Sequence, residues 1–202
     1  MRLLIATTNP DKLREIRRLL ATSRVDLLSL RDLPPVAEPE ETGSTFQENA
    51  RLKALYYDEH AGAPPGTCTV AEDSGLVVDA MDGEPGVHSA RFLRPDASYP
   101  ERFAEIQRRL AARPERPRTA RFVCAVTLVR SGEVLFETIG LVEGEIADAA
   151  HGSAGFGYDP IFFYPPYGAT LADVTEQDKL AVAHRGRAFR QLAMWLLEDG
   201  PD

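Results

Sequence analysis

Two long runs of strand-forming residues, joined at Ser131-Gly132, most constrain the fold of this chain. The first run covers residues 119–130 (TARFVCAVTLVR) and the second covers residues 133–147 (EVLFETIGLVEGEIA). Both runs are rich in β-branched and aromatic residues, and a short Gly-containing link between such runs is typical of a hairpin. We therefore expect a long pair of antiparallel strands.

Helical patterns alternate with the strand-like runs. Thr45 precedes Glu48, and Ser98 precedes Glu101, at the three-residue spacing of a capping box. The spacing of apolar residues predicts helices over residues 11–22, 45–60, 102–112 and 186–200. The expected buried faces carry Leu13, Ile16, Leu19 and Leu20 in the first of these helices, and Phe189, Leu192 and Leu196 in the last.

The remaining strands complete the expected architecture. Residues 2–6 form one apolar run, and residues 67–70 and 76–81 form two more on either side of the segment AEDSG (71–75). We interpret the last two as separate strands that meet at AEDSG, and expect this pair to be antiparallel. Pro- and Gly-rich loops are expected at residues 33–44, 62–66, 82–92 and 151–169. Strands and helices that intermingle in this way favour an α/β fold with a mixed sheet.

Composition restricts the class of protein. The chain has 202 residues and is 44% hydrophobic, which suits one globular domain over residues 1–202, with room for two lobes. No apolar run approaches the roughly 20 residues that span a bilayer, and the first residues resemble a buried strand more than a signal peptide. Cys68 and Cys124 lie in strand-like runs, which indicates buried thiols in a reducing compartment. The net charge of −8 argues against binding to nucleic-acid polymers or acidic membranes.

The segment AEDSG places two carboxylates side by side. Adjacent strand residues point to opposite faces, so Glu72 and Asp73 need not share one task. One can face a cleft while the other pairs with a base behind it. Glu40 or Glu41 is expected to add a further carboxylate, and such a set with water and phosphate oxygens suits Mg²⁺. The alternative is a strand end with solvated acids.

Two helix starts carry candidate anion-binding groups. In ATTNPDK (6–12), Asn9 is a favourable N-cap and Pro10 suits the first helical position, so free N–H groups and Lys12 are expected to face an anion. In the helix over residues 45–60, Asn49 and Lys53 share the apolar face, where a lysine must find an anion. The alternatives are an ordinary capped helix, and a Lys53 that reaches out to solvent while Asn49 caps a strand.

Two late segments complete the list of candidates. GFGYDP (155–160) is a Gly-punctuated aromatic turn that suits contact with a base, or else a core loop. KLAVAHRGRAF (179–189) brings Lys179, His184 and Arg185 close together in sequence, either as a binding group or as a solvated basic cluster.

Five segments in this order give the chain a family resemblance: ATTNPDK, EETGSTFQENARLKA, AEDSGLVVDAMDGEPGVHSARF, GFGYDPIFF and DKLAVAHRGRA. Together they resemble the inosine triphosphate pyrophosphatase family, also called HAM1-like, from Leu3 to the last helix. The resemblance implies an elongated α/β fold with a long mixed sheet and two lobes around a cleft that holds the active site. It also implies a cytoplasmic homodimer that uses Mg²⁺ to hydrolyse ITP, dITP and XTP to the monophosphate and pyrophosphate.

The resemblance also implies residue roles. It assigns Glu41 and Asp73 to the metal, with Asp73 as the proton acceptor and Glu72 either behind the metal ligands or in contact with the metal. It assigns Lys53 a place near the phosphates and a catalytic role, and Ser74 a contact with substrate. The triphosphate is assigned to Thr7, Thr8, Asn9, Pro10, Asp11 and Lys12. The nucleoside is assigned to Phe156, Gly157, Tyr158, Asp159, Lys179, His184 and Arg185.

Two other functions stay open at this stage. One is a related pyrophosphatase of the Maf type that acts on modified pyrimidines, against which the segment HRG argues. The other is a nucleotide-binding module without catalysis, which has no need of Glu41, Asp73 and two lysines at one polyphosphate. Among purines, donors from His184 and Arg185 near O6 would favour 6-keto bases over adenine. Ala154 and Ala183 depart from the family pattern, and these departures bear on fine specificity.

Overall fold

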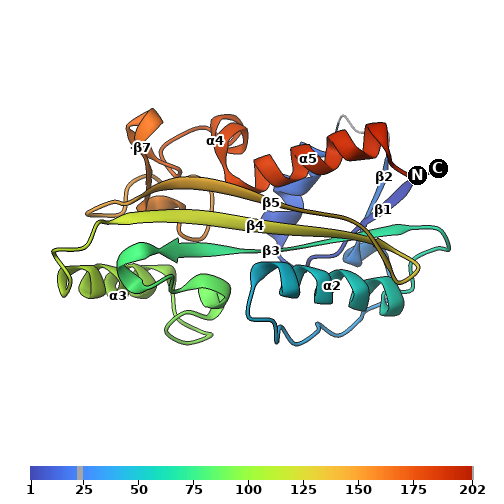
Figure 1. Ribbon diagram of the computed structural model, residues 1–202, viewed down its shortest axis with the longest axis horizontal. Coiled ribbons are helices and arrows are strands. Elements are labelled where there is room, and N and C mark those ends of the chain that lie inside the picture. Colours follow the sequence, from blue (N-terminus) through green and yellow to red (C-terminus); the bar gives the residue numbers. More distant parts are fainter. Residues whose placement is uncertain (22–24, 202) are drawn as a thin grey trace. The chain divides into compact units, whose positions relative to one another are not determined.

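A computed structural model describes residues 1–21 and 25–201 and shows an α/β fold built on one sheet of seven strands (Figure 1). The strand order is β2-β1-β3-β4-β5-β6-β7. The strands are β1 (Arg2–Ile5), β2 (Asp26–Ser29), β3 (Cys68–Val78), β4 (Thr119–Arg130), β5 (Glu133–Ile146), β6 (Phe162–Tyr164) and β7 (Ala169–Thr170). The predicted α/β class is therefore confirmed.

The sheet is mixed, as predicted. β1 pairs in parallel with β2 and with β3, whereas β6 pairs antiparallel with β5 and with β7. The predicted long pair is also present, because β4 and β5 are neighbours joined at Ser131 and Gly132. Both residues have positive φ, 54° and 78°, as the favoured two-residue hairpin turn requires.

The prediction of two strands meeting at AEDSG is wrong. Residues 71–75 lie within β3, which runs without a break from Cys68 to Val78. A two-residue hairpin needs left-handed backbone, and no residue in this segment has positive φ. Glu72 and Asp73 therefore sit in the middle of a strand, and only residues 79–81 leave it, as a 3₁₀ turn.

The predicted helices are present, with small shifts at their ends. Both predicted capping boxes form, at Thr45–Glu48 and at Ser98–Glu101. The helices are α1 (Pro10–Leu19), α2 (Phe46–His60), α3 (Tyr99–Ala111), α4 (Glu176–Val182) and α5 (His184–Glu198). The first ends before its predicted limit at Thr22, a position outside the described residues. Over residues 1–21 and 25–201, no helix combines the length and the apolar character that a membrane crossing requires.

Close contacts divide the chain into two compact units. Unit 1 comprises Met1–Asp73, Cys124–Gly140 and His184–Asp202, and unit 2 comprises Ser74–Val123 and Leu141–Ala183. The expected single domain with an active site in a cleft between two lobes stays a prediction.

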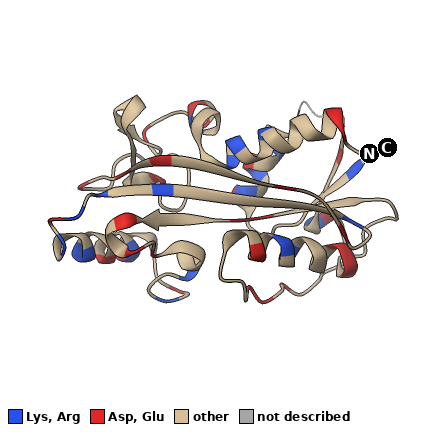
Figure 2. Ribbon diagram, viewed as in Figure 1, with Lys and Arg blue, Asp and Glu red and all other residues tan. Residues whose placement is uncertain are grey.

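Unit 2 packs α3 against the sheet strands of the same unit. Ile106 and Leu110 of α3 are buried in a cluster with Phe122, Phe162 and other apolar side chains. The outer face of the helix carries charges of both signs (Figure 2). There Glu105 pairs with Arg108 at 2.8 Å, as is common on a solvated helix face.

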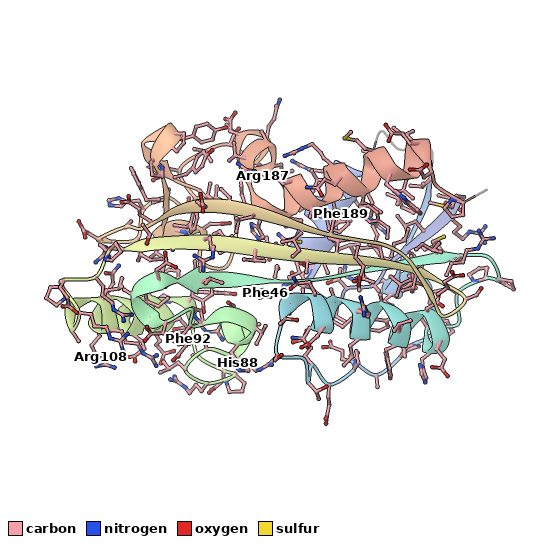
Figure 3. All side chains as sticks on the ribbon, in the orientation of Figure 1. Phe46, His88, Phe92, Arg108, Arg187 and Phe189 are labelled. Atoms are coloured by element: carbon pink, nitrogen blue, oxygen red, sulfur yellow. The ribbon has the colours of Figure 1, made fainter. Side chains whose placement is uncertain are left out.

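Unit 1 has helices on both faces of its strands (Figure 1). Side chains of α1 and α5 pack with β1, β3 and β4 in one cluster, and side chains of α2 pack with β1 and β3 in another. Figure 3 shows Phe189 of α5 directed to the sheet and Arg187 directed away from it. A Cβ on Gly140 would lie 2.0 Å from the carbonyl oxygen of His184, so this glycine allows α5 to approach β5 closely.

Candidate active site

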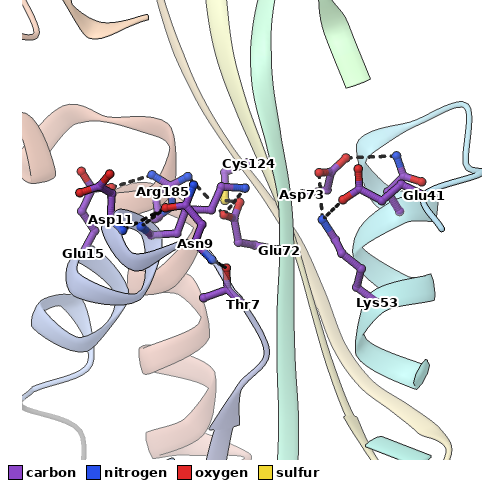
Figure 4. Close-up of polar contacts among 12 residues, drawn as sticks. Thr7, Asn9, Asp11, Glu15, Glu41, Lys53, Glu72, Asp73, Cys124 and Arg185 are labelled. Atoms are coloured by element: carbon purple, nitrogen blue, oxygen red, sulfur yellow. Dashed lines mark hydrogen bonds and ion pairs between the residues drawn. The ribbon is translucent and has the colours of Figure 1, made fainter. Parts of the chain in front are cut away.

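β3 presents Glu72 and Asp73 on opposite faces of the sheet, both within unit 1 (Figure 4). The alternation of side chains along a strand separates the two carboxylates, as the sequence predicted. Both are buried, with 4% and 5% of their surface exposed. Each has its own basic partners, so they are not solvated acids at a strand end.

The Asp73 carboxylate meets α2 and the loop that precedes it. Lys53 Nζ lies 3.0 Å from Asp73 Oδ1 and 2.6 Å from Glu41 Oε1. Asn49 Nδ2 donates to the other oxygen, Asp73 Oδ2, at 3.2 Å. Lys53 thus finds anions instead of solvent, and Asn49 contacts a side chain instead of capping a strand. Glu40, the alternative to Glu41, is exposed.

Burial and the neighbouring charges both shift the pKa values of Asp73 and Lys53. Burial raises the pKa of Asp73, and Lys53 and Lys12 only partly offset this, so the pKa lies above its ordinary value. The negative charge of Glu41 acts in the same direction as burial. Burial works to lower the pKa of Lys53, but Asp73 and Glu41 outweigh it and raise that pKa. The lysine therefore remains charged, and the carboxyl is the more readily protonated partner.

On the opposite face, Glu72 holds two cations from distant parts of the chain. Lys12 Nζ lies 2.8 Å from Glu72 Oε1, and Arg185 Nη2 lies 3.2 Å from the same oxygen. Arg185 Nη1 contacts Glu15 Oε2 of α1 at 2.6 Å. The thiol of Cys124 donates to Glu72 Oε2 at 3.3 Å.

This second cluster is a buried network of balanced charge. Burial raises the pKa of Glu72, but Arg185 and Lys12 overcome it and hold that pKa well below its ordinary value. Burial raises the pKa of Cys124, and Glu72 adds to the effect, so the thiol stays protonated and acts as a donor. The two carboxylates and two cations neutralise one another, which is the usual condition for burying charge.

The start of α1 forms as predicted, but its N–H groups are not free. Asn9 is the N-cap and Pro10 follows it. Asn9 Oδ1 accepts hydrogen bonds from the N–H groups of Asp11 and Lys12, at 2.9 Å and 3.1 Å. The expectation of free N–H groups at these two positions is therefore wrong, because the cap already satisfies them. The Thr7 hydroxyl in turn accepts from the N–H of Asn9 at 3.3 Å.

In unit 2, the side chain of Lys179 contacts the predicted aromatic turn of residues 155–160. Lys179 Nζ lies 2.6 Å from Asp159 Oδ2, and both side chains are 3% exposed. The ammonium also lies 4.7 Å from the centre of the Phe156 ring, within cation–π range. Gly155 has φ of 72°, and a Cβ there would lie 2.2 Å from Asp159 Oδ2, so the turn requires glycine.

The other residues predicted to contact substrate differ in how deeply they are buried. Tyr158 is buried and donates its hydroxyl to the carbonyl oxygen of Ser89 at 2.8 Å, which gives it a place in the core of unit 2. His184 is buried at the start of α5 in unit 1. Thr8 is exposed. Gly157 has positive φ, and Ser74 is half-buried on β3. Their roles toward substrate stay predictions.

Three residues in these clusters were not assigned to the site from the sequence. Asn49 stood out by its position, four residues before Lys53 on the same helix face, but received no role. Glu15 follows Lys12 by three residues on α1, a spacing that places both side chains on the same face of the helix. Cys124 carried no signal beyond its strand, and its contact with Glu72 joins residues 52 positions apart.

Comparison with known proteins fits this arrangement. The profile of the Ham1 family matches residues 3–195. The dITP/XTP pyrophosphatase of Exiguobacterium sibiricum is 44% identical over 193 residues, which cover 95% of both proteins. A HAM1 protein from Coxiella burnetii has a TM-score of 0.86 at 36% identity, covering 98% of this chain and 99% of that one.

A third relative has a solved structure, and its name includes an activity. It is a nucleoside-triphosphatase / dITP/XTP pyrophosphatase from Mycobacterium abscessus, with a TM-score of 0.72 at 42% identity. The match covers 95% of this chain and 97% of that chain. Profile, sequence and structure agree over nearly the whole length, and the chain belongs to the Ham1 family.

Proposed function

We propose that this protein hydrolyses the noncanonical purine nucleotides ITP, dITP and XTP to the nucleoside monophosphate and pyrophosphate. Family membership and the names of its relatives support this activity. The observation that carries the proposal is the cluster on one face of β3, where Asp73 and Glu41 converge on the Lys53 ammonium. A buried carboxylate beside a second carboxylate and a lysine suits the activation of water next to a polyphosphate.

The same cluster fits a divalent metal. Glu41 and Asp73 already accommodate one cationic group between them, and hard carboxylate oxygens are the ligands that Mg²⁺ prefers. In residues 1–21 and 25–201, no group of three or more His, Cys, Asp or Glu side chains is placed to hold a metal. Two carboxylates suffice for Mg²⁺ when water and substrate phosphates supply the other ligands. The bound ion would offset phosphate charge and polarise the phosphoanhydride.

Charge balance supports the need for that ion. Lys12, Lys53 and Arg185 bring three positive charges to the two clusters, and the four carboxylates bring four negative charges (Figure 4). The formal balance is therefore negative, at about −1. A triphosphate meeting this site would be repelled unless a cation accompanied it.

The residues themselves perform the remaining steps. Asp73 accepts the proton of the water that attacks the α-phosphate, since its carboxylate is buried in the cluster that would hold the metal and is oriented there by Lys53 and Asn49. Lys53, beside Asp73, stabilises the departing pyrophosphate by its charge, and Lys12 adds its positive charge from the opposite face of β3. Thr7, Thr8, Asn9 and Lys12 hold the triphosphate through their side chains, because Asn9 occupies the N–H groups of Asp11 and Lys12, and Pro10 and Asp11 shape the turn that presents them.

The nucleoside is assigned to the aromatic turn and the basic residues of the sequence motif. Phe156 offers a ring, and the Asp159–Lys179 pair holds the turn that carries it. His184 and Arg185 remain the proposed donors toward the 6-keto oxygen. Arg185 is shared by Glu15 and Glu72, so these carboxylates fix the direction of its guanidinium. A cytoplasmic location and a homodimer also belong to the proposal, and sedimentation at micromolar concentration tests the dimer.

A panel of triphosphates tests the activity. The purified protein with Mg²⁺ is given ITP, dITP, XTP, GTP and ATP, and pyrophosphate and orthophosphate are measured separately. We expect pyrophosphate and the monophosphate from the first three. We expect kcat/KM for ITP at least about 100-fold above that for ATP, because adenine leaves buried donors facing donors.

Two other results would point elsewhere. Orthophosphate with IDP as the first products would contradict attack at the α-phosphate. Heat on titration with ITP, without turnover under the same conditions, would favour a binding module without catalysis.

A further inference from the structure

Asn49 joins the Glu41 loop to the Asp73 carboxylate. The residue lies in the first turn and a half of α2 and has no exposed surface. Its Oδ1 accepts a hydrogen bond from the backbone N–H of Gly43 at 2.8 Å. Its Nδ2 donates to Asp73 Oδ2 at 3.2 Å. Both ends of the side-chain amide are therefore engaged inside the protein.

The orientation of this amide follows from the chemistry of its partners. A backbone N–H can only donate, so the atom of Asn49 that faces Gly43 must be the oxygen. The NH₂ group then faces Asp73, where only an acceptor can receive it. The Gly43 N–H thus fixes which end of Asn49 meets the carboxylate, and the amide cannot be flipped without losing both bonds.

We propose that Asn49 is a positioning residue that orients the Asp73 carboxylate for catalysis. This proposal rests on the proposed function, in which Asp73 is the proton acceptor. Lys53 holds Oδ1 at 3.0 Å and Asn49 holds Oδ2 at 3.2 Å, so the plane of the carboxylate is set by two donors from one helix. The four-residue spacing of Asn49 and Lys53 places both on the same face of α2.

The second bond of Asn49 gives it an effect on Glu41 as well. Gly43 lies two residues after Glu41, and its N–H is held by Asn49. Glu41 in turn shares the Lys53 ammonium with Asp73. One amide therefore sets both the angle of the base and the position of the loop that brings the second carboxylate. Partners of this kind behind a reacting group are worth about 10- to 100-fold in activity.

The test replaces the donor and keeps the acceptor. In Asn49→Asp, one carboxylate oxygen can still accept from the Gly43 N–H, but the group that donated to Asp73 is lost. We expect kcat for ITP to fall about 10- to 100-fold. Because the new carboxylate also faces Asp73 Oδ2, the uncharged variant Asn49→Leu is measured beside it, and there we expect the same range of loss in kcat with KM changed less than about 3-fold. Gln47→Glu is the matched control, since it adds the same charge at an exposed position of the same helix. We expect it to keep native kcat.

A double-mutant cycle separates positioning from a general effect on the fold. Asn49→Leu, of similar volume and without hydrogen-bonding groups, is combined with Asp73→Asn, and residual turnover is measured at high enzyme concentration. If Asn49 acts through Asp73, the second substitution costs little once Asp73 has gone. Asn49→Ala is taken through the same cycle, so that the result does not depend on one variant folding.

The outcomes distinguish this proposal from the proposed function. Native kcat in folded Asn49→Asp, while Asp73→Asn is inactive, would overturn the role of Asn49 and leave the function standing. Equal fold losses for the Asn49 substitution in the native and Asp73→Asn backgrounds would also overturn it. Native turnover in Asp73→Asn would instead contradict the role of Asp73 as proton acceptor, and absence of ITP turnover in the parent protein would contradict the proposed function.

Discussion

At the scale of single residues, the two adjacent acids of β3 have opposite electrostatic states. Asp73 is buried beside another carboxylate, and its pKa is raised. Glu72 is buried between two cations, and its pKa is held well below the ordinary value. These neighbouring residues therefore differ in their charge. Asp73 can take up a proton, whereas Glu72 stays ionised and binds Lys12 and Arg185.

Asp73→Asn is expected to separate activity from stability. Turnover of ITP should fall about 100-fold or more, as for loss of a general base. A carboxyl with a raised folded-state pKa stabilises the fold at low pH and loses that contribution as pH rises through its folded pKa. The neutral amide avoids this loss, so its melting temperature should equal or exceed that of the parent at pH 7. Calorimetry between pH 4 and pH 8 checks this, and a large drop in melting temperature at pH 7 would contradict it.

For Glu72, the contribution of the carboxylate to stability is expected to depend on pH in the opposite direction, and Glu72→Gln tests this. A carboxyl with a depressed pKa contributes stability that is present above its unfolded-state value and lost as pH falls through the folded value. Removing this charge leaves Lys12 and Arg185 short of a buried partner, at a cost of about 3–5 kcal/mol at pH 7. The difference in unfolding free energy between the variant and the parent should narrow as pH falls below 4.5, the ordinary pKa of glutamate. Urea unfolding at pH 7 and pH 4 measures it, and a gap independent of pH would argue against the network.

At the scale of elements, the start of α2 couples its capping loop to the site. Thr45 and Glu48 close the capping box, and Asn49 follows directly with its bond to Gly43. The backbone N–H groups of Gly43, Ser44 and Thr45 are thereby held by the side chains of Asn49 and Glu48. Its geometry depends on close packing at the glycine.

Gly43→Ala tests that packing. A Cβ at this position would lie 2.6 Å from Asn49 Oδ1 and 2.7 Å from the Cβ of Glu48, so the amide or the loop must move. We expect a loss of about 1–3 kcal/mol in unfolding free energy and a lower kcat through displacement of Asn49. Thr42→Ala, at the exposed neighbouring position, serves as the control. Unchanged stability and kcat in Gly43→Ala would show that the loop yields without cost.

Local signals predicted some elements well and others poorly. α2, α3 and the β4–β5 hairpin carry capping boxes or a two-residue turn, so their residues determine them locally. β2, β6, β7 and α4 have between two and seven residues and show little periodicity, and they were not predicted. AEDSG was misread because Ser-Gly favours turns, whereas pairing within the sheet keeps it extended.

The candidate site likewise contains residues with a local sequence signal and residues without one. The position of Lys53 on the buried face indicated a nearby anion, and strand alternation indicated that Glu72 and Asp73 separate. The contact of Arg185 with Glu15 joins residues 170 positions apart and has no local signature. The orientation of Asn49 depends on a loop N–H that only the folded chain brings to it.

At the scale of the whole molecule, the chain is acidic and its site is acidic too. The sequence carries a net charge of −8, and the two clusters on β3 contain one more carboxylate than cations. A substrate with several negative charges therefore meets an unfavourable field both at a distance and at close range. The proposed function requires a cation for a reason that lies in the charge of the protein, apart from any role in polarising phosphate.

Removal of divalent ions should therefore abolish turnover without unfolding the protein. After dialysis against a chelator, we expect hydrolysis of ITP to fall below detection and to return when Mg²⁺ is added, because uncompensated carboxylates repel the triphosphate. The fold should persist, since Lys53 bridges Glu41 and Asp73 at 2.6 Å and 3.0 Å and neutralises part of their charge. Circular dichroism and the melting temperature report the fold, and pyrophosphate release reports activity. Native turnover in the metal-free protein would contradict the metal requirement, whereas loss of the fold on chelation would show that the Lys53 bridge cannot replace the ion.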